Sequence, residues 1–320
     1  MSLSENDAMM RRSIRRQSIS AASKRHSARA LAFKENALAY VFLAPSLALF
    51  AVFLFYPLLK SVYLSFQLTD PRGRVAAFAG LDNFKELFSS ELFYSSLKVT
   101  LSFTLLTVPT GIAVALLLAA LSHQKLRGIK AFRFVFSLPV AISVGTGSVI
   151  WMMLYHPTLG MLNYFLTLLD LEPVRWLSDP AWALVSVSIM TVWMNLGFTY
   201  IVLLSGLQSV PEEIYDSAKI DGSGPLRTFV RITLPLVSPT LFFTAIVSVI
   251  GAFQSFGQIH LLTKGGPMNS TDVIVFNIYR DAFVNFRFGI GSAQALVLFV
   301  IILILTVVQF RFFEKKVHYQ

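Results

Sequence analysis

Eight residues in two long apolar stretches offer the chemistry for contact with a polar solute. The set comprises Trp193, Asn195, Gly197, Tyr200, Ser248, Gln254, Ser255 and Gln258. Amide and hydroxyl groups can hydrogen-bond to sugar hydroxyls, and aromatic rings pack on the apolar face of a pyranose. Taken singly, each polar group fits better as a hydrogen bond between helices, which contributes about 0.6 kcal/mol on average in membranes. As a group, on either side of one charged loop, these residues are predicted to line a solute path.

Sequence motifs for catalysis are absent. The chain has no Cys, no Gly-Lys-Ser/Thr phosphate loop, no His/Glu pair with metal spacing and no Gly-x-Ser-x-Gly turn. We therefore expect no catalytic residue, no metal site and no cofactor in this chain. The apolar stretches contain no Asp, Glu, Lys or Arg, which argues against an ion-coupled carrier because such carriers usually hold charge within the membrane. Some sodium sites use only hydroxyls and carbonyls, so a secondary carrier is kept as a less favoured alternative.

The composition predicts an all-α polytopic membrane protein. Of 320 residues, 55% are hydrophobic and 14% are charged, whereas soluble domains usually carry about 25% charged residues. Six uncharged stretches reach the length of about 20 residues that a helix needs to cross a bilayer. The predicted spans are 37–59, 99–124, 134–155, a helix within 181–211, a helix within 232–263, and 288–310. Residues 161–169 are apolar but too short to span, and they predict an interfacial helix.

Basic residues predict which side of the membrane each loop faces. The net charge is +10, but Lys and Arg lie in short loops beside apolar spans, so we interpret them as topology signals and expect no nucleic-acid partner. With the amino terminus inside, 18 Lys and Arg fall inside and 9 outside, which predicts that both termini are cytoplasmic. The basic tail at 1–36 is predicted to be mostly disordered, ahead of one membrane domain at 37–320. Its densest cluster is Arg11, Arg12, Arg15 and Arg16.

The charged segment at 210–235, called the signature loop below, predicts a helix, a glycine turn and a second helix. Ser209 and Glu212 have the spacing of a capping box, and Pro211 suits a first helical turn. Gly222 is expected to end the first helix, because glycine takes the left-handed conformation at little cost. The first helix has an apolar stripe at Val210, Ile214 and Ala218. The second is expected to start at Pro225, to stop at Pro235, and to turn inward Leu226, Phe229, Val230 and Thr233.

This loop resembles the cytoplasmic signature of the permeases of binding-protein-dependent ABC importers. The signature is Glu-Ala-Ala, three residues, Gly, nine residues and Ile-x-Leu-Pro, and its spacing is matched by Asp216, Ser217, Ala218, Gly222, Ile232, Leu234 and Pro235. The departures are Asp for Glu and Ser for Ala. The turn with Gly265, Gly266 and Pro267 is similar to the Gly-Gly-Pro segment of sugar-type permeases in the same superfamily.

The resemblance implies a type I ABC importer fold of six transmembrane helices, similar to maltose permeases. It implies a permease subunit that passes a carbohydrate from an external solute-binding protein into the cytoplasm; the alternative solute is glycerol-3-phosphate or another small polar molecule. The implied location is the bacterial cytoplasmic membrane. The implied partners are a second permease chain, the solute-binding protein, and two ATP-binding subunits that hold ATP and Mg²⁺. Contact with the ATP-binding subunit is expected at Glu213, Asp216, Ser217, Ala218, Asp221, Gly222, Ile232, Leu234 and Pro235.

Overall fold

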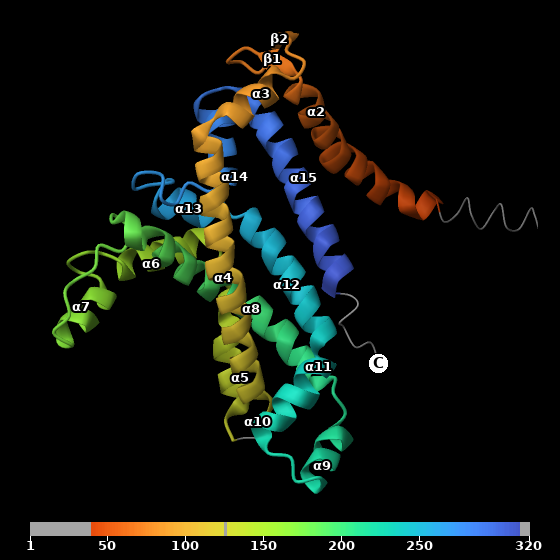
Figure 1. Cartoon of the computed structure of the whole chain (residues 1–320), viewed down its shortest axis with the longest axis vertical. Coiled ribbons are helices and arrows are strands. Elements are labelled where there is room, and N and C mark those ends of the chain that lie inside the picture. Colours follow the sequence, from red (N-terminus) through yellow and green to blue (C-terminus); the bar gives the residue numbers. More distant parts are fainter. Residues whose placement is uncertain (1–39, 125–126, 314–320) are drawn as a thin grey trace, which may run out of the picture. The chain divides into compact units, whose positions relative to one another are not determined.

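The computed structural model describes residues 40–124 and 127–313 (Figure 1). The predicted basic tail, Lys125 and residues 314–320 lie outside this part of the chain. Contacts divide the chain at Lys60 and Ser61 into two units, which are described separately.

The described part of the first unit is one apolar helix. Residues 40–50 are α-helical and continue through a π-helical stretch, η1 (Ala51–Phe55), into α2 (Tyr56–Ser65), whose last residues belong to the second unit. The helix Tyr40–Ser65 is long and apolar enough to cross a membrane, which confirms the first predicted span from Tyr40 onward. Every side chain from Tyr40 to Lys60 is exposed. A helix that is apolar all round needs lipid or another protein around it.

Four long helices form the second unit. They are α4 (Glu91–His123), α8 (Pro180–Gln208), α12 (Ser238–Phe253) and α15 (Phe288–Phe313). Helix α8 packs along α4, and α12 lies against both (Figure 1). Small residues at the contact, Ala115 and Ala119 of α4, are fully buried and let the backbones approach closely. These helices confirm four more of the predicted spans.

The predicted third span is wrong as a continuous helix. Helix α5 (Ile129–Ser137) runs into the 3₁₀ turn η2 (Leu138–Ala141), and the chain bends by 106° before α6 (Val144–Leu154). Ser143 begins α6 by accepting a hydrogen bond from the Thr146 amide, 3.2 Å. A run of uncharged residues therefore predicted the membrane location but not the break within it.

The fifth span is also interrupted. Helix α12 ends at Phe253 and α13 (Gly257–Leu262) begins after three non-helical residues. Ser255, one of the predicted path residues, lies in this break and not on a helix. Its hydroxyl donates to the Gly251 carbonyl, 3.1 Å.

Short elements connect the long helices. Strands β1 (Gln67–Thr69) and β2 (Val75–Phe78) form an antiparallel hairpin that leads into α3 (Asp82–Ser89). The predicted interfacial helix exists as α7 (Met161–Leu168), with Tyr164 and Phe165 exposed. The connection between α8 and α12 contains α9 (Glu212–Ile220), α10 (Pro225–Thr228), the π-helical η3 (Phe229–Thr233) and α11 (Leu234–Leu236). That connection and the β hairpin lie at opposite ends of the second unit (Figure 1).

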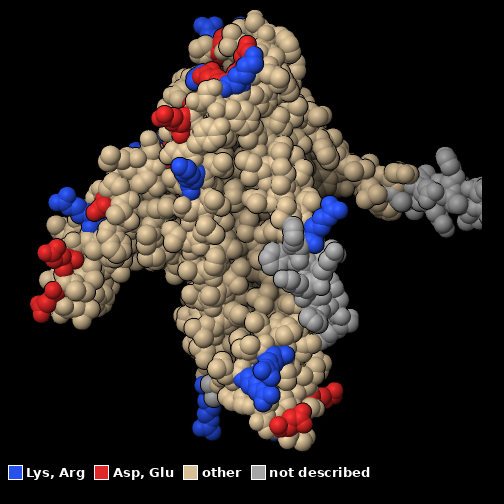
Figure 2. Space-filling view, viewed as in Figure 1, with Lys and Arg blue, Asp and Glu red and all other residues tan. Residues whose placement is uncertain are grey.

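Charged side chains are also concentrated near the ends of the helices. On the face drawn in Figure 2, most Lys, Arg, Asp and Glu side chains lie near the ends of the helices, with a largely uncharged surface between them. An uncharged band bounded by charged ends is the pattern expected of a membrane domain.

A buried ion pair holds the connection between α13 and α15. Asp272 is 1% exposed and its Oδ2 lies 2.7 Å from Nη2 of Arg280, at the junction of α14 (Ile274–Tyr279) and the π-helical η4 (Arg280–Val284). Burial raises the pKa of the Asp272 carboxyl above its ordinary value, against the opposing effect of Arg280. Asp272 directly follows the predicted Gly-Gly-Pro turn, in which the Thr271 hydroxyl donates to the Gly266 carbonyl, 2.7 Å.

Replacing Asp272 with Ala should lower the free energy of unfolding by about 3 kcal/mol, because it leaves a partly buried guanidinium without its partner. Thermal unfolding of the detergent-purified protein measures the change. The control is Lys85→Ala, which breaks the exposed pair with Asp82, 2.8 Å, and should cost less than about 1 kcal/mol. Equal shifts in the two variants would contradict a stabilising role for the buried pair.

Candidate functional site

The first helix of the signature loop begins differently from the prediction. Pro211 occupies the N-cap position of α9, and no side chain caps this end. The predicted capping box is wrong, because the Ser209 hydroxyl donates to the Gly206 carbonyl, 2.8 Å, and thereby belongs to the end of α8. The predicted inward stripe is confirmed at Val210 and Ala218, which are 5% and 4% exposed.

Gly222 ends α9 as predicted, with a φ of +70°. The Gly222 amide donates to the Lys219 carbonyl, 3.0 Å, and the Ser223 amide to the Ala218 carbonyl, 2.9 Å. This pair of bonds is the Schellman motif, which satisfies carbonyls at the end of a helix and requires a left-handed residue. The glycine of the signature therefore has a backbone role.

The second half of the loop is helical from Pro225 to Leu236, so Pro235 does not stop it. The π-helical η3 ends at Thr233, two residues before Pro235, and alters the hydrogen-bond pattern close to the point where proline offers no amide donor. Phe229 and Thr233 face inward as predicted, with Thr233 3% exposed. The prediction is wrong for Leu226 and Val230, which are 75% and 51% exposed.

The outer surface of the loop is both apolar and charged. Ile220, beside the glycine turn, is 87% exposed, and with Leu226 and Val230 it forms a set called the apolar tip below. Asp216 pairs with Lys219, 2.9 Å, on the exposed surface. Of the other residues predicted to contact an ATP-binding subunit, exposed positions are held by Glu213, Ser217, Asp221 and Gly222, and half-buried ones by Ile232, Leu234 and Pro235.

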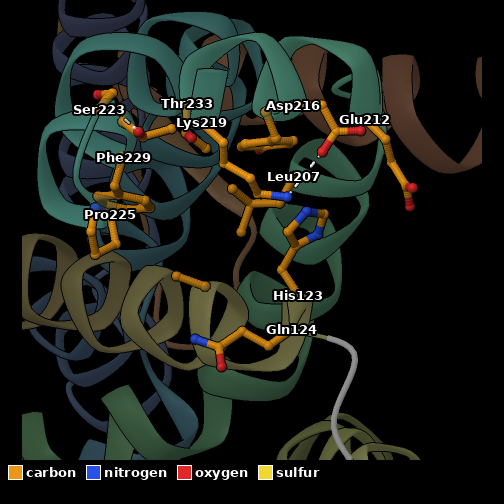
Figure 3. Close-up of a pocket in the computed structure, with 13 residues that line it drawn as sticks. His123, Gln124, Leu207, Glu212, Asp216, Lys219, Ser223, Pro225, Phe229 and Thr233 are labelled. Atoms are coloured by element: carbon orange, nitrogen blue, oxygen red, sulfur yellow. Dashed lines mark hydrogen bonds and ion pairs between the residues drawn. The ribbon is translucent and has the colours of Figure 1, made fainter. Parts of the chain in front are cut away.

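A cavity of about 620 Å³ lies behind the loop, between it and the ends of α4 and α8. Figure 3 shows Phe229 and Pro225 on one wall, with His123 and Gln124 from the end of α4 on another. Its other lining residues are Ala120, Leu207, Glu212, Tyr215, Asp216, Lys219, Ser223, Thr228 and Thr233.

The predicted solute-path residues do not all gather in one place. Asn195 of α8 and Ser248 of α12 line one small cavity of about 20 Å³. Helix α4 provides its third wall, although none of the predicted solute-path residues lies on this helix. The lining residues are Thr107, Val108, Gly111, Ile112, Val192, Asn195, Thr199, Ser248 and Ala252. The signal available was the polar periodicity of α4, at Ser96, Thr100, Thr104 and Thr107.

Asn195 is a polar residue exposed in the middle of α8, where the exposed residues that follow it, Phe198 and Ile201, are apolar. An amide facing hydrocarbon would lose hydrogen bonds that nothing in lipid replaces. The structure therefore requires water or another protein at this face.

Other predicted path residues have partners within the chain. The Gln258 amide donates to the Thr191 hydroxyl, 3.2 Å, and the Tyr200 hydroxyl to Ser122 Oγ, 2.6 Å. Trp193 packs edge-on against Trp151, with ring centroids 5.8 Å apart. Gln254 is exposed beside the break between α12 and α13.

Gly197 lies where α8 crosses η2. A Cβ atom there would lie 2.6 Å from the Val140 amide nitrogen, so only glycine permits this approach. In this structure, Gly197 is a packing contact between two spans.

Comparison with known proteins gives consistent matches. A family described as "Binding-protein-dependent transport system inner membrane component" matches residues 93–319. The chain is 36% identical over 286 residues to the sn-glycerol-3-phosphate transport system permease protein of Yersinia enterocolitica, covering 88% of this chain and 96% of that protein. It is 35% identical over 290 residues to the protein of the same description from Agrobacterium fabrum, with coverages of 90% and 98%.

Two solved structures are also similar. The crystal structure of a bacterial ABC transporter involved in the import of the acidic polysaccharide alginate matches with a TM-score of 0.79 and 26% identity, covering 88% of this chain and 96% of that chain. The structure of a bacterial alginate ABC transporter in complex with an alginate pentasaccharide-bound periplasmic protein matches with a TM-score of 0.77 and 27% identity, with coverages of 86% and 93%.

The exposed face of α8 can be tested by thiol labelling, since the chain has no native cysteine. Asn195→Cys should react with a charged, membrane-impermeant thiol reagent, because a thiolate forms only where water reaches the sulfur. The control is Leu105→Cys on α4, which is 63% exposed and lies within one turn of Thr107. It should remain unlabelled where lipid covers it. Labelling of Leu105→Cys but not Asn195→Cys would contradict a water-accessible or solute-facing role for this face.

Proposed function

This chain belongs to the family of binding-protein-dependent transport system inner membrane components, and from that premise we propose that separate ATP-binding subunits drive it through the signature loop. The chain is the permease of an ABC importer, with an all-α membrane fold. In the proposal the partner subunits bind ATP and Mg²⁺ and carry out hydrolysis, and this chain contributes no catalytic residue.

The observation that carries the proposal is the exposed apolar tip of the signature loop. Ile220 and Leu226 lie on opposite sides of the Gly222 turn with most of their surface exposed. The surrounding loop is charged, so it is suited to water rather than to lipid. Large apolar side chains exposed on an otherwise polar loop are a feature of protein–protein interfaces. A rigid helix pair presenting them fits a groove on a soluble partner.

The orientation in the proposal places the signature loop and both termini in the cytoplasm. The excess of Lys and Arg in the loops at that end supports this orientation. The β hairpin and α3, at the opposite end of the second unit, then face outward, where a solute-binding protein would deliver its cargo. The alginate transporter related to this chain is described in complex with a periplasmic protein, which supports the same arrangement here.

A second permease chain completes the proposed assembly. The exposed Asn195 requires a cover that the described residues of the second unit do not supply. The helix Tyr40–Ser65 is apolar enough to require lipid or protein around it. We assign the cover of Asn195 to the solute path between two permease chains. The cavity shared by Asn195, Thr199, Ser248 and Thr107 then forms one wall of that path.

A carbohydrate is the solute that the polar groups fit best. The small cavity has hydroxyl and amide groups and no charged side chain. Arg280 is paired with the buried Asp272, and Arg287 pairs with Glu86 at the exposed surface, so both guanidinium groups already have a carboxylate partner. The second candidate is sn-glycerol-3-phosphate, because the two curated relatives are described as its permeases.

The proposed mechanism uses the direct connections of the loop. Helix α8 ends at Gln208, next to the loop, and α11 leads through Val237 into α12. ATP binding closes the two ATP-binding subunits and moves the docked loop. Helices α8 and α12 then tilt, so that the path opens outward to receive solute. Hydrolysis resets the path to the inward-facing state.

The complex purified through a tag on this chain should contain the ATP-binding subunits and the second permease. In proteoliposomes with the solute-binding protein it should import solute only with ATP. Competition between neutral sugars and sn-glycerol-3-phosphate on the solute-binding protein then identifies the solute class. Uptake by this chain alone, driven by a sodium or proton gradient, would overturn the proposal in favour of a secondary carrier.

Gly222→Val should reduce both transport and recovery of the ATP-binding subunit. A β-branched residue at a φ of +70° costs about 1–2 kcal/mol, which disfavours the turn that presents the apolar tip. The matched control is Gly224→Val. Both glycines have open space around a Cβ atom, but Gly224 has a φ of −68° and an extended ψ of 159°, which suits the residue before a proline. Full recovery and transport with Gly222→Val would contradict docking through this turn.

A further inference from the structure

Ser122 forms a buried junction near the end of α4. The residue is fully buried, and its hydroxyl both donates to the Leu118 carbonyl, 2.7 Å, and accepts from the Tyr200 hydroxyl, 2.6 Å. Tyr200 is 1% exposed and belongs to α8. The bond therefore connects two of the long helices through groups with no access to bulk water. A hydrogen bond in such surroundings is strong and directional, because no solvent competes for it.

The same residue also holds α5. Nε and Nη2 of Arg133 donate to the Ser122 carbonyl at 3.2 Å and 2.7 Å. Carbonyl groups in the last turn of a helix have no intrahelical partner and carry the negative end of the helix dipole. The guanidinium of Arg133, on the next helix, supplies both a hydrogen-bond donor for the carbonyl and a positive charge at the negative end of the dipole. Ser122 thus joins α4, α5 and α8.

The next residue contacts the signature loop. The His123 ring lies 5.6 Å from the Tyr215 ring of α9, centroid to centroid, with the planes at 46°. Both side chains line the cavity of about 620 Å³ behind the loop. Figure 3 shows His123 at the wall of this cavity, so the side chains of α9 and α4 do not pack continuously against each other beside the contact. A displacement of α9 toward α4 therefore reaches α4 at His123, one residue from the junction that holds α8.

We propose that Ser122 and Tyr200 are positioning residues that transmit movement of the signature loop to α8. The inference rests on the proposed function, since it assumes that the loop is moved by a partner. It assigns the Tyr200 hydroxyl to Ser122 rather than to the solute. Loss of the bond leaves α9 joined to α8 only through residues 209–211 and the packing around them, so less of the loop's movement reaches α8 and ATP is hydrolysed with less solute imported.

The chain offers a matched control in its other buried tyrosine bond. The Tyr155 hydroxyl donates to the Ser186 carbonyl of α8, 2.8 Å, and Tyr155 is 1% exposed. Tyr155→Phe removes a buried hydroxyl bonded to the same helix as Tyr200→Phe does. It does so next to α6 and away from the signature loop. A merely structural effect of losing such a bond would be the same in both variants.

The test compares the number of solute molecules imported per ATP hydrolysed by the reconstituted complex. Tyr200→Phe and Ser122→Ala should each lower this ratio by about fivefold, the factor expected when one buried hydrogen bond is lost. The double variant should be no worse than the more affected single variant, because both changes remove one interaction. Tyr155→Phe should keep the wild-type ratio.

Two outcomes would overturn the inference. If Tyr200→Phe changes solute selectivity while Ser122→Ala keeps the wild-type ratio, Tyr200 contacts solute, since the fully buried Ser122 cannot. A lowered ratio in Tyr155→Phe as well would show that loss of any buried hydroxyl bond to α8 reduces solute import per ATP, which would reject a specific role for Ser122 and Tyr200. Where Tyr200→Phe fails to assemble, the smaller change Ser122→Ala decides between the alternatives.

Amide hydrogen exchange provides a readout that does not depend on transport. Tyr200→Phe and Ser122→Ala should speed exchange in α9, whereas Tyr155→Phe should not. Unchanged exchange in α9 would reject the junction even in an active importer. Failure of the wild-type complex to import would reject the proposed function but not the junction.

Discussion

Hydrocarbon offers no hydrogen bonds, and this constraint organises the membrane part of the chain. The hydroxyl groups of Thr100, Thr104 and Thr107 each donate to the carbonyl four residues earlier, at 2.7–2.8 Å. Thr100 also accepts from the Ile274 amide, 2.8 Å, and so holds α14 against α4. The hydroxyl groups on this buried face of α4 are thus satisfied within the chain. Asn195 does not follow this pattern, because its side chain is exposed at mid-span. A polar residue bonded within the chain has a structural role, whereas an exposed one such as Asn195 needs a solute path or a partner chain beside it.

The signature loop also satisfies backbone hydrogen bonds within the chain, at the turn that ends α9. Ala218 is small and buried under the turn, and its carbonyl accepts the bond that closes the Schellman motif at Gly222. The alanine and glycine of the signature therefore build the turn. The side chains on either side of that turn, Ile220 and Leu226, remain exposed.

Bends in the spans depend on close backbone contacts. A Cβ atom at Gly197 would lie 2.6 Å from the Val140 amide nitrogen, and one at Gly257 would lie 2.8 Å from the Val144 side chain. These contacts hold the two sides of the 106° bend, η2 against α8 and α6 against α13. In each of these two spans, a segment beside the break therefore packs against a neighbouring helix.

The amino-acid sequence by itself determined the class of protein, the location of the membrane segments and the C-terminal end of α9, because these depend on local properties: long uncharged stretches and a glycine at 222. It also identified the family, through the spacing from Asp216 to Pro235. Tertiary structure decided the rest. Leu226 and Val230 face outward in the folded loop, and Ser209 bonds within α8 rather than capping α9. The third wall at Thr107 and the bond from Tyr200 to Ser122 join residues 78 or more positions apart, and no local periodicity encodes which helices will meet.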